Sequence, residues 1–235
     1  MQLTVRDAAL LLNLSEKTIY RWIKKQAIPA MRIGDQYRFN RTELLEWATA
    51  RRLPLSPSMF QEEKIPGQPL RINLALKEGG IYYRVGGRDR AGVLQSVVDL
   101  LRLPEDLNRD WLFQVLLARE LLGSTAIGNG IAIPHVRTPI VLQIPRPQIT
   151  LCFLEEPVDF GSLDGQPVHT LFVLISPTIR AHLHLLSRLA HILHHAGLRQ
   201  ALATQGSREE ILAQVEDAER SIRDSDTQDP ETRPA

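Results

Sequence analysis

One stretch without periodicity constrains the fold most, because it divides the chain in two. Residues 51–69 read RRLPLSPSMFQEEKIPGQP, a segment rich in proline, serine and charge in which no helical or strand period is sustained. Such composition is typical of linkers, and a chain of 235 residues is long enough for two domains. We therefore predict a small domain over residues 1–52, a linker over 53–69, a larger domain over 70–217 and a disordered acidic tail over 218–235.

Charge is distributed unevenly between the two ends of the chain. The formal net charge is +1, but residues 1–53 hold ten Lys/Arg and five Asp/Glu, a net of +5, whereas residues 205–235 hold four Lys/Arg and nine Asp/Glu, a net of −5. The two ends are therefore expected to have different partners. The last residues also carry few large apolar side chains, which is the composition of a disordered segment.

The bulk composition is that of an ordinary globular protein, with 43% hydrophobic and 23% charged residues. The single cysteine, Cys152, lies in the apolar run ITLCFL, cannot form an internal disulfide and is expected to be buried. The N-terminus lacks the pattern of a signal peptide, and no apolar run reaches the length of a membrane span. We expect a cytoplasmic protein without membrane insertion.

The first fifty residues carry the signals of three helices and a hairpin. Thr4 and Asp7 are placed as a capping box at the start of one helix, and Ser15 is placed to cap a second that ends near Lys25. The segment AMRIGDQYRFN alternates apolar and polar residues around a Gly-Asp turn, as a hairpin does. Asn40 then caps a third helix.

The second of these helices has a basic side and an apolar side. On a helical wheel the basic arc holds Lys17, Arg21, Lys24 and Lys25, and the opposite side holds Ile19, Trp22 and Ile23. The hairpin adds Arg32 and Arg38. Such a face is typical of a helix that enters the major groove of DNA. The alternative is a solvated face on a purely structural helix, but the turn, the basic arc and the basic hairpin occur together.

The order of these elements resembles the excisionase-family DNA-binding domain, a small winged helix-turn-helix. The resemblance covers residues 1 to about 50 and includes the sequence IPAMRIG at the start of the wing. It implies base and phosphate contacts from Lys17, Thr18, Arg21 and Lys24, and wing contacts from Arg32 and Arg38. A module of this size binds weakly alone, so a dimer or a second protein would be needed for a specific site.

The larger region alternates helical patterns with continuous apolar strands. RAGVLQSVVDLL and NRDWLFQVLLARELLG are helical, and GIAIP, QITLCFL and HTLFVLIS read as strands. This order indicates an α/β sheet covered by helices on both faces.

A candidate phosphate site surrounds the segment GNGIAIPHVRT. Pro134 ends the hydrogen bonding of a short strand, so His135 emerges at the carboxyl end of that strand, where α/β sheets bind ligands. Upstream, the guanidinium of Arg119 is placed to hold a phosphate through two hydrogen bonds. Hydroxyls and turn amides that are expected to approach an anion come from Ser124, Thr125, Gly128 and Gly130.

The segment IRAHLHLLSRLAHILHH supplies a second histidine. His182 shares a helix face with leucines and points into the domain, whereas the other histidines face outward. His191 and His195 have the i, i+4 spacing of metal ligands without an accompanying carboxylate pattern, so we expect solvated histidines and no metal site. His182 alone would be read as a core histidine, and a lone Pro-His as an ordinary loop. Their joint presence with Arg119 favours function.

These motifs resemble the type-2 enzyme IIA domain of the phosphoenolpyruvate-dependent phosphotransferase system, the fructose, mannitol and nitrogen-type family. ARELLGSTAIGNGIAIPH, VDFGSLDGQPVHTLFVLISP and AHLHLLSRLA occur in the order and spacing of the family over about residues 70 to 217. The resemblance implies a mixed sheet flanked by helices and no cofactor. It also implies that His135 accepts a phosphoryl group from a histidine-containing phosphocarrier protein, with His182 as second active-site histidine and Arg119 near the phosphate. An enzyme IIB or a regulatory target would follow downstream.

One departure from this family lies directly after the histidine. Val136 and Arg137 stand where the family usually has Gly-Lys or a similar small-residue pair, and a β-branched residue restricts the backbone. Docking or transfer rate is therefore expected to differ.

Three functions are compatible with the sequence. In the first, a phosphohistidine-carrying enzyme IIA domain is fused to a DNA-binding module, so that phosphorylation adjusts transcription. In the second, the DNA-binding regulator retains an enzyme IIA-like domain that no longer transfers phosphate and acts as an interaction or sensory module. The third, a plain component of sugar transport, is weakened by the basic N-terminal module. Whether the chain is an enzyme thus depends on phosphoryl transfer at His135.

Overall fold

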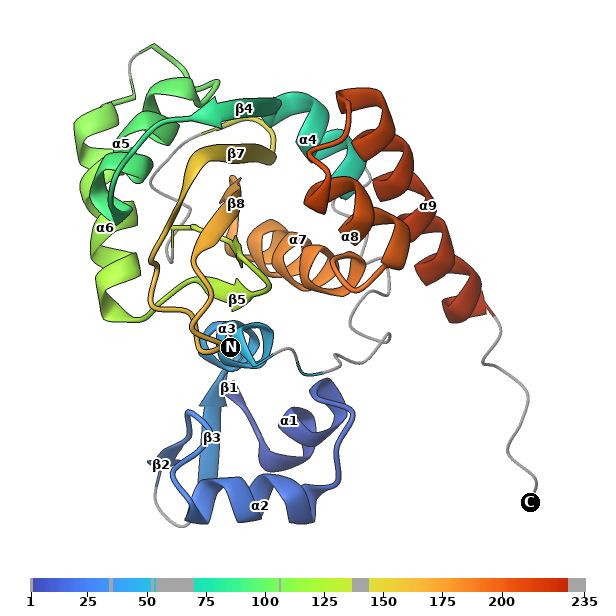
Figure 1. Ribbon diagram of the computed structural model, residues 1–235. Coiled ribbons are helices and arrows are strands. Elements are labelled where there is room, and N and C mark those ends of the chain that lie inside the picture. The colour runs from blue at the N-terminus through green and yellow to red at the C-terminus, as the bar shows by residue number, and fades with distance from the viewer. Residues whose placement is uncertain are drawn as a thin grey trace.

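The computed structural model describes residues 2–33, 36–51, 53, 70–105, 107–136 and 144–227. Figure 1 shows a small N-terminal unit beside a larger unit built on a sheet. Most of the predicted linker, the tip of the hairpin at Gly34 and Asp35, and the end of the predicted tail from residue 228 lie outside the described residues.

The N-terminal unit is a winged helix-turn-helix, as the sequence predicts. Its elements are β1 (Gln2–Leu3), α1 (Val5–Leu11), α2 (Glu16–Lys24), β2 (Met31–Ile33), β3 (Gln36–Asn40) and α3 (Arg41–Ala50). The strands form an antiparallel sheet in the order β1-β3-β2. The capping box between Thr4 and Asp7 is confirmed, and the hydrogen bonds that Thr4 donates to the Asp7 carboxylate lower the pKa of Asp7. Ser15 accepts the Thr18 amide at 3.2 Å and caps α2.

A compact apolar core holds these short elements together. Side chains from all three helices and from β3 are fully buried in it, among them Ala8, Leu12, Ile19, Phe39, Leu44 and Leu45. The rings of Trp22 and Trp47 meet edge to face at 5.4 Å between centroids, which joins α2 to α3. α2 is therefore fixed by packing against its neighbours rather than by its own propensity.

The larger unit has a mixed sheet between two layers of helices, which confirms the expected fold class. Its elements are α4 (Ile72–Gly79), β4 (Ile81–Val85), α5 (Arg90–Leu100), α6 (Arg109–Leu122), β5 (Ala126–Gly128), β6 (Ile131–Ala132), β7 (Gln148–Val158), β8 (Val168–Ile175), α7 (Ile179–Ile192), α8 (Ala196–Ala203) and α9 (Arg208–Thr227). The strand order is β4-β7-β8-β6-β5. β4 runs parallel to β7 and β6 parallel to β8, whereas the β7–β8 and β5–β6 pairs are antiparallel.

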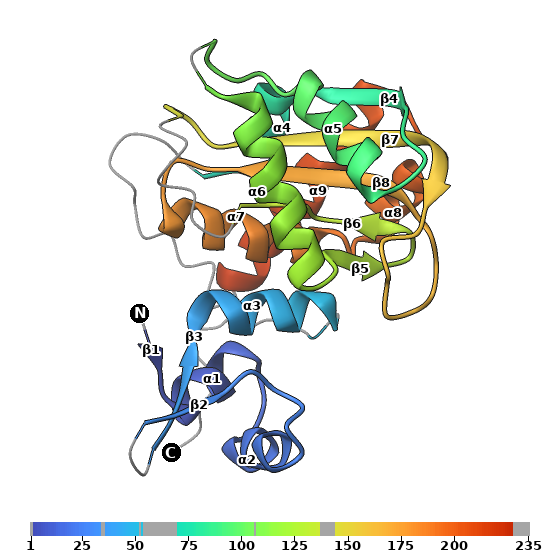
Figure 2. The same cartoon turned by 90° about the vertical axis from the view of Figure 1, so that its left-hand side faces the viewer.

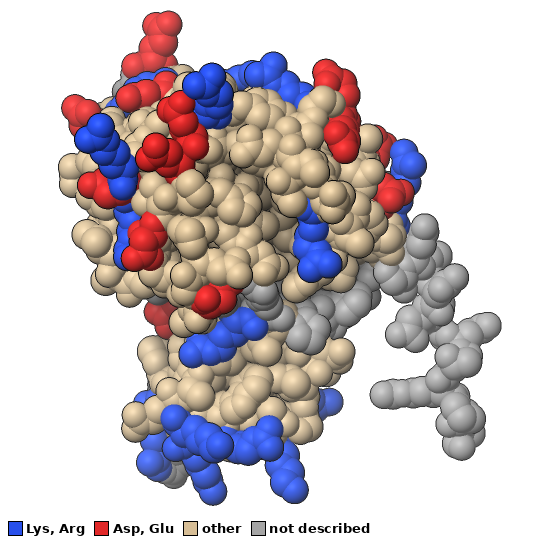
Figure 3. Space-filling model, viewed as in Figure 1, with Lys and Arg blue, Asp and Glu red and all other residues tan. Residues whose placement is uncertain are grey.

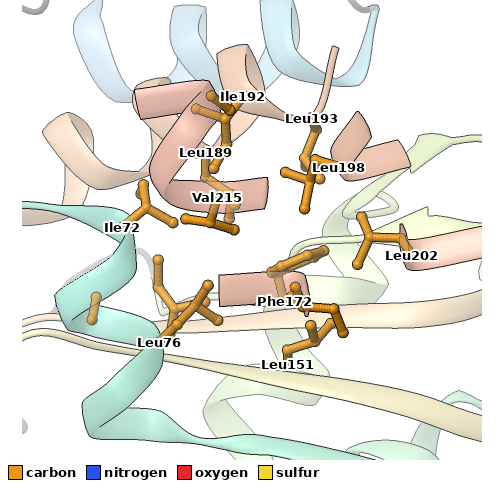
Figure 4. Close-up of a cluster of buried hydrophobic side chains, with 14 of the residues drawn as sticks. Ile72, Leu76, Leu151, Phe172, Leu189, Ile192, Leu193, Leu198, Leu202 and Val215 are labelled. Carbon is orange, nitrogen blue, oxygen red and sulfur yellow. The ribbon is translucent and has the colours of Figure 1, made fainter. Parts of the chain in front are cut away.

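Two apolar cores lie on opposite faces of this sheet. One joins the strands to α4, α7, α8 and α9, and Figure 4 shows Leu151 and Phe172 of the strands beneath Leu189 of α7 and beside Leu76 of α4. The other joins them to α5 and α6. Alternate residues of β7 and β8 enter alternate cores, which explains why residues 151–154 and 171–175 are apolar without interruption. Cys152 is buried as expected, and burial raises the pKa of its thiol to about 12.

The expected disordered tail from residue 218 is wrong for residues 218–227, because α9 continues to Thr227. Ala218 and Ile222 are each 1% exposed and extend the apolar stripe of the helix at a spacing of four residues. Glu219 is also buried, and its carboxylate accepts the Ile72 amide at 2.7 Å and the Asn73 amide at 3.3 Å. The acidic composition of the segment concealed both the stripe and this cap on α4.

Replacement of Glu219 by alanine is expected to lower the free energy of unfolding by about 1–3 kcal/mol, because two amides at the start of α4 lose their buried acceptor. Chemical denaturation of the whole chain measures the loss. Glu209→Ala is the matched control, since Glu209 is exposed in the first turn of the same helix. Equal losses in both variants would mean that the cap contributes nothing beyond a general effect of charge.

Candidate functional site

His135 lies at the carboxyl ends of β6 and β8, the edge that the sequence predicts. It forms an isolated parallel bridge with Leu174, and the Leu174 amide donates to the Pro134 carbonyl at 3.0 Å. The side chain is only 3% exposed. Backbone pairing on both sides of the imidazole therefore fixes where the ring emerges.

A hydrogen bond determines which ring nitrogen of His135 is available for chemistry. Nδ1 lies 2.7 Å from the carbonyl oxygen of Ile133. Because a carbonyl oxygen only accepts, Nδ1 carries the proton and Nε2 retains the lone pair of the neutral ring. Nε2 is thus the nucleophilic atom of this side chain.

His182 is brought next to His135, as the sequence predicts. It lies in the first turn of α7, which Thr178 caps by accepting the Ala181 amide at 3.1 Å. The two imidazole centroids are 5.0 Å apart, with the ring planes inclined at 43°. Nδ1 of His182 lies 3.5 Å from the Ser176 hydroxyl, and the ring is 1% exposed. The site therefore contains a pair of buried imidazoles from separate elements.

Arg119 is in the last turn of α6, half-buried, and its guanidinium donates to the Gly123 carbonyl at 2.7 Å. This bond holds the turn that leads from α6 into β5. The side chain thus lies at the start of the segment that carries the two predicted hydroxyls.

Those hydroxyls have structural partners. The Ser124 hydroxyl accepts the Ala126 amide at 3.1 Å. Thr125 is buried, and both its hydroxyl and its amide donate to the carboxylate of Glu120. The Thr125 hydroxyl proton is thus committed to Glu120, whereas the Ser124 hydroxyl accepts in its bond and keeps its own proton for a further acceptor.

Glu120 is a residue that sequence reasoning missed. It is 1% exposed and bonds Thr125, whose carbonyl accepts the Ile133 amide at 3.0 Å. Ile133 in turn accepts the Nδ1 proton of His135. A chain of hydrogen bonds therefore runs from a buried carboxylate to the imidazole. The available signal was Glu120 within the run LLARELL, four residues before Ser124 and five before Thr125.

The Gly-Asn-Gly turn is not brought to the imidazole. Gly128, Asn129 and Gly130 all have positive φ, at 85°, 54° and 69°, and form the tight connection between β5 and β6. His135 lies beyond the other end of β6, so an extended chain of about 16 Å separates it from Gly130. A Cβ on Gly130 would lie 2.3 Å from the ring of His169, whose pKa is lowered by burial. These glycines accommodate His169 and the turn.

Replacement of Thr125 by valine tests the hydrogen-bond chain. The substitution keeps the side-chain volume but removes one donor from the buried Glu120 carboxylate, so we expect the free energy of unfolding to fall by about 1–3 kcal/mol. We also expect the imidazole of His135 to be held less firmly, because Ile133 loses its fixed neighbour. Chemical denaturation checks the first effect. Thr125→Ser keeps the hydroxyl that donates to Glu120 and is the matched control, and equal losses in the two variants would contradict the role of Glu120.

The predicted DNA-contacting residues gather on one end of the N-terminal unit. Lys17, Arg21, Lys24 and Lys25 are exposed, whereas Ile19 is buried. Figure 3 shows Lys and Arg side chains crowded over this end, where Figure 1 places α2.

The other three predicted contacts lie on the wing and at the cap of α2. Arg32 is exposed on the wing. Arg38 is half-buried and donates to the Gln36 side chain, and the Thr18 hydroxyl lies 3.0 Å from that of Ser15 at the cap. Thr18 and Arg38 therefore already have roles in the local structure.

The remaining histidines of α7 are less exposed than expected. His184 lies 3.4 Å from the guanidinium of Arg188, which is itself 4% exposed and donates to the Leu70 carbonyl. His195 ends the segment by capping α8, where Nδ1 accepts the Leu198 amide at 3.4 Å. His195 therefore has a structural role at the helix junction.

Within the part of the chain that the structure describes, none of the helices combines the length and apolar character that crossing a membrane requires.

Comparison with protein families gives a separate match for each unit. Residues 75–218 match the family model described as "Phosphoenolpyruvate-dependent sugar phosphotransferase system, EIIA 2". Residues 3–52 match a family of helix-turn-helix domains.

Individual relatives resemble the larger unit. A nitrogen regulatory protein of Pseudomonas aeruginosa is 37% identical over 154 residues, which cover 64% of this chain and 97% of that protein. A nitrogen regulatory protein of Escherichia coli K12 is 34% identical over 152 residues, covering 64% of this chain and 92% of that protein. The crystal structure of nitrogen regulatory protein IIA-Ntr from Neisseria meningitidis superposes with a TM-score of 0.51 at 31% identity, covering 57% of this chain and 92% of that one.

Proposed function

Because this chain belongs to the EIIA 2 family of the phosphoenolpyruvate-dependent sugar phosphotransferase system, we propose that His135 accepts and carries a phosphoryl group. The observation that carries the proposal is the hydrogen bond from Nδ1 of His135 to the Ile133 carbonyl, which leaves Nε2 as the nucleophile. The donor is a small histidine-containing phosphocarrier protein. The acceptor downstream is an enzyme IIB or a regulatory target.

The transfer exchanges one N–P bond for another. The bond between phosphorus and the donor imidazole breaks while the Nε2 lone pair of His135 forms the new bond, and the electron pair of the broken bond returns to the donor ring. Nδ1 keeps its proton and its bond to the Ile133 carbonyl, which stabilises the positive charge that develops on the ring. No proton has to move.

Two neighbouring groups complete this chemistry. Such a transfer needs alignment and charge neutralisation more than covalent assistance. We assign the neutralising role to the guanidinium of Arg119 and assign to His182 a hydrogen bond to a phosphoryl oxygen. The 5.0 Å separation of the imidazole centroids supports the second assignment.

The second half of the proposal is regulation of DNA binding by the phosphorylation state. It is supported by the helix-turn-helix match over residues 3–52 and by the exposed basic residues of α2. Residues 1–52 act as the DNA-binding domain and 70–217 as the phosphoryl domain, joined by the linker at 53–69, in the cytoplasm. Both bacterial relatives described above are nitrogen regulatory proteins, which favours a nitrogen signal over a sugar signal.

A second candidate is a DNA-binding regulator whose EIIA domain no longer transfers phosphate. The burial of both imidazoles, at 3% and 1% exposure, favours it, because a donor ring needs access to Nε2. Val136, a buried β-branched residue directly after His135, favours it as well.

One experiment separates these candidates. The native chain is incubated with phosphoenolpyruvate and the upstream carriers, assayed for acid-labile label, and then titrated with duplex DNA. Label on His135 together with a changed DNA affinity supports the first candidate. An unlabelled chain that binds DNA supports the second, and a labelled chain that binds no duplex at low salt contradicts the regulatory half.

A further inference from the structure

Helix α3 belongs to one domain and lies against the other. In Figures 1 and 2 it lies along β5 and beneath α7, on the side of the N-terminal unit that faces the sheet. We propose that α3 is the element that couples the two domains, and that phosphorylation of His135 weakens its docking. This inference rests on the proposed function, because it names how the phosphoryl site regulates the DNA-binding domain.

The contact on α7 is one residue from the active site. Leu183 follows His182, is half-buried, and packs against the apolar core of the N-terminal unit. Consecutive residues of a helix point about 100° apart. The same turn of α7 therefore directs His182 toward His135 and Leu183 toward the DNA-binding domain, so a rotation or shift of this turn moves both.

The contact on β5 leads to the active site by a second route. β5 is the edge strand of the sheet, and α3 lies against it in place of a further strand. β5 pairs with β6, and the adjoining Thr125 carbonyl accepts the amide of Ile133, which holds Nδ1 of His135. Both surfaces that α3 touches are thus connected to the imidazole pair by bonded or packed neighbours.

The core side of α3 fixes this helix firmly within the N-terminal unit. Leu44, Leu45 and Ala48 are fully buried in the N-terminal unit, and Trp47 packs against Trp22 of α2. The basic surface of α2 lies at the opposite end of this unit from the sheet (Figures 1 and 3). Docking through α3 therefore leaves the basic surface accessible and fixes its orientation.

A phosphoryl group on His135 disturbs this docking for steric and electrostatic reasons. The imidazole centroids are 5.0 Å apart and both rings are buried, so a phosphoryl group on Nε2 requires the ring of His182 to move outward before it can donate to a phosphoryl oxygen. The phosphoryl group also brings about −1.5 to −2 charges to the first turn of α7. The amides of that turn attract anions, so the turn is pulled toward the phosphate. Movement of that turn moves Leu183 and loosens α3.

Hydrogen exchange on the full chain tests the proposal. Backbone exchange is measured for α3 and α1 in native protein and in Leu183→Asp, before and after phosphorylation with phosphoenolpyruvate and the carriers. In the native chain we expect phosphorylation to speed exchange of α3 at least about fivefold, the lower end of usual coupling between sites. Leu183→Asp should show the fast exchange without phosphorylation and no further change with it, while α1 stays unchanged.

Leu74→Asp is the control, since Leu74 is an exposed leucine of α4. Leu183→Ala repeats the test with a milder change should aspartate disturb α7. The proposal is overturned if α3 exchanges equally in native and Leu183 variants, or if labelled native protein keeps α3 as protected as before. Absence of label at His135 contradicts the proposed function. The docking contact is then judged by comparing the unphosphorylated native chain with the Leu183 variants. Faster exchange of α3 in the variants supports the contact, while the missing label rejects its control by phosphorylation.

Discussion

His135→Ala will take up no acid-labile phosphoryl group under conditions that label the native chain, a loss of at least about 1,000-fold in rate. The substitution removes the only ring nitrogen that the Ile133 hydrogen bond leaves with a lone pair at the sheet edge. His182 does not replace it, because its ring lies on a separate element, in the first turn of α7, and not at the end of the strand.

Two further histidine variants make this result specific. His182→Ala should still be labelled, but about 100-fold more slowly, since one positioned group typically contributes a factor of this order. His194→Ala is the matched control, because His194 is exposed beyond the end of α7, and it should be labelled at the native rate. Label that persists in His135→Ala would assign the chemistry to another nitrogen and remove the basis of the carrier function.

The fold was predictable where the side-chain pattern is local. β7 and β8 are continuous apolar runs because each face of the sheet has its own core, and α5 and α6 show helical periodicity. The caps at Thr4 and Ser15 depend on bonds over three residues and are readable from the sequence. Elements that depend on distant partners are different: Glu219 is separated by 147 positions from the amide that it accepts. Nothing near Glu219 in the sequence indicates that partner.

The candidate site shows the same division. The pairing of His135 and His182 followed from motifs that carry the histidines on separate elements, and the centroids lie 5.0 Å apart. Other roles of the predicted phosphate-binding residues could not be read from the sequence, since Gly130 forms a turn against His169 and the Thr125 hydroxyl donates to Glu120. A glycine or a hydroxyl has several uses within a fold, and only the register of β5 on β6 decides between them.

The DNA-binding half of the proposal makes an equally large prediction. Replacement of Arg21 and Lys24 by alanine is expected to weaken binding to duplex DNA about 100-fold at low salt. Both side chains are exposed on α2, and Figure 3 shows the cationic surface to which this helix belongs. Each phosphate contact that is lost removes about one released counterion, so the slope of log K against log salt should fall by about two.

The control for this variant removes the same charge elsewhere. Lys77 and Arg199 are exposed cations on α4 and α8 of the phosphoryl domain, and their double replacement by alanine changes the net charge equally. If the basic end of the N-terminal unit is the binding surface, this control should keep the native affinity and the native salt slope. Equal weakening in both variants would mean that the chain attracts DNA through its overall charge, and α2 would then be a solvated helix without a role in recognition.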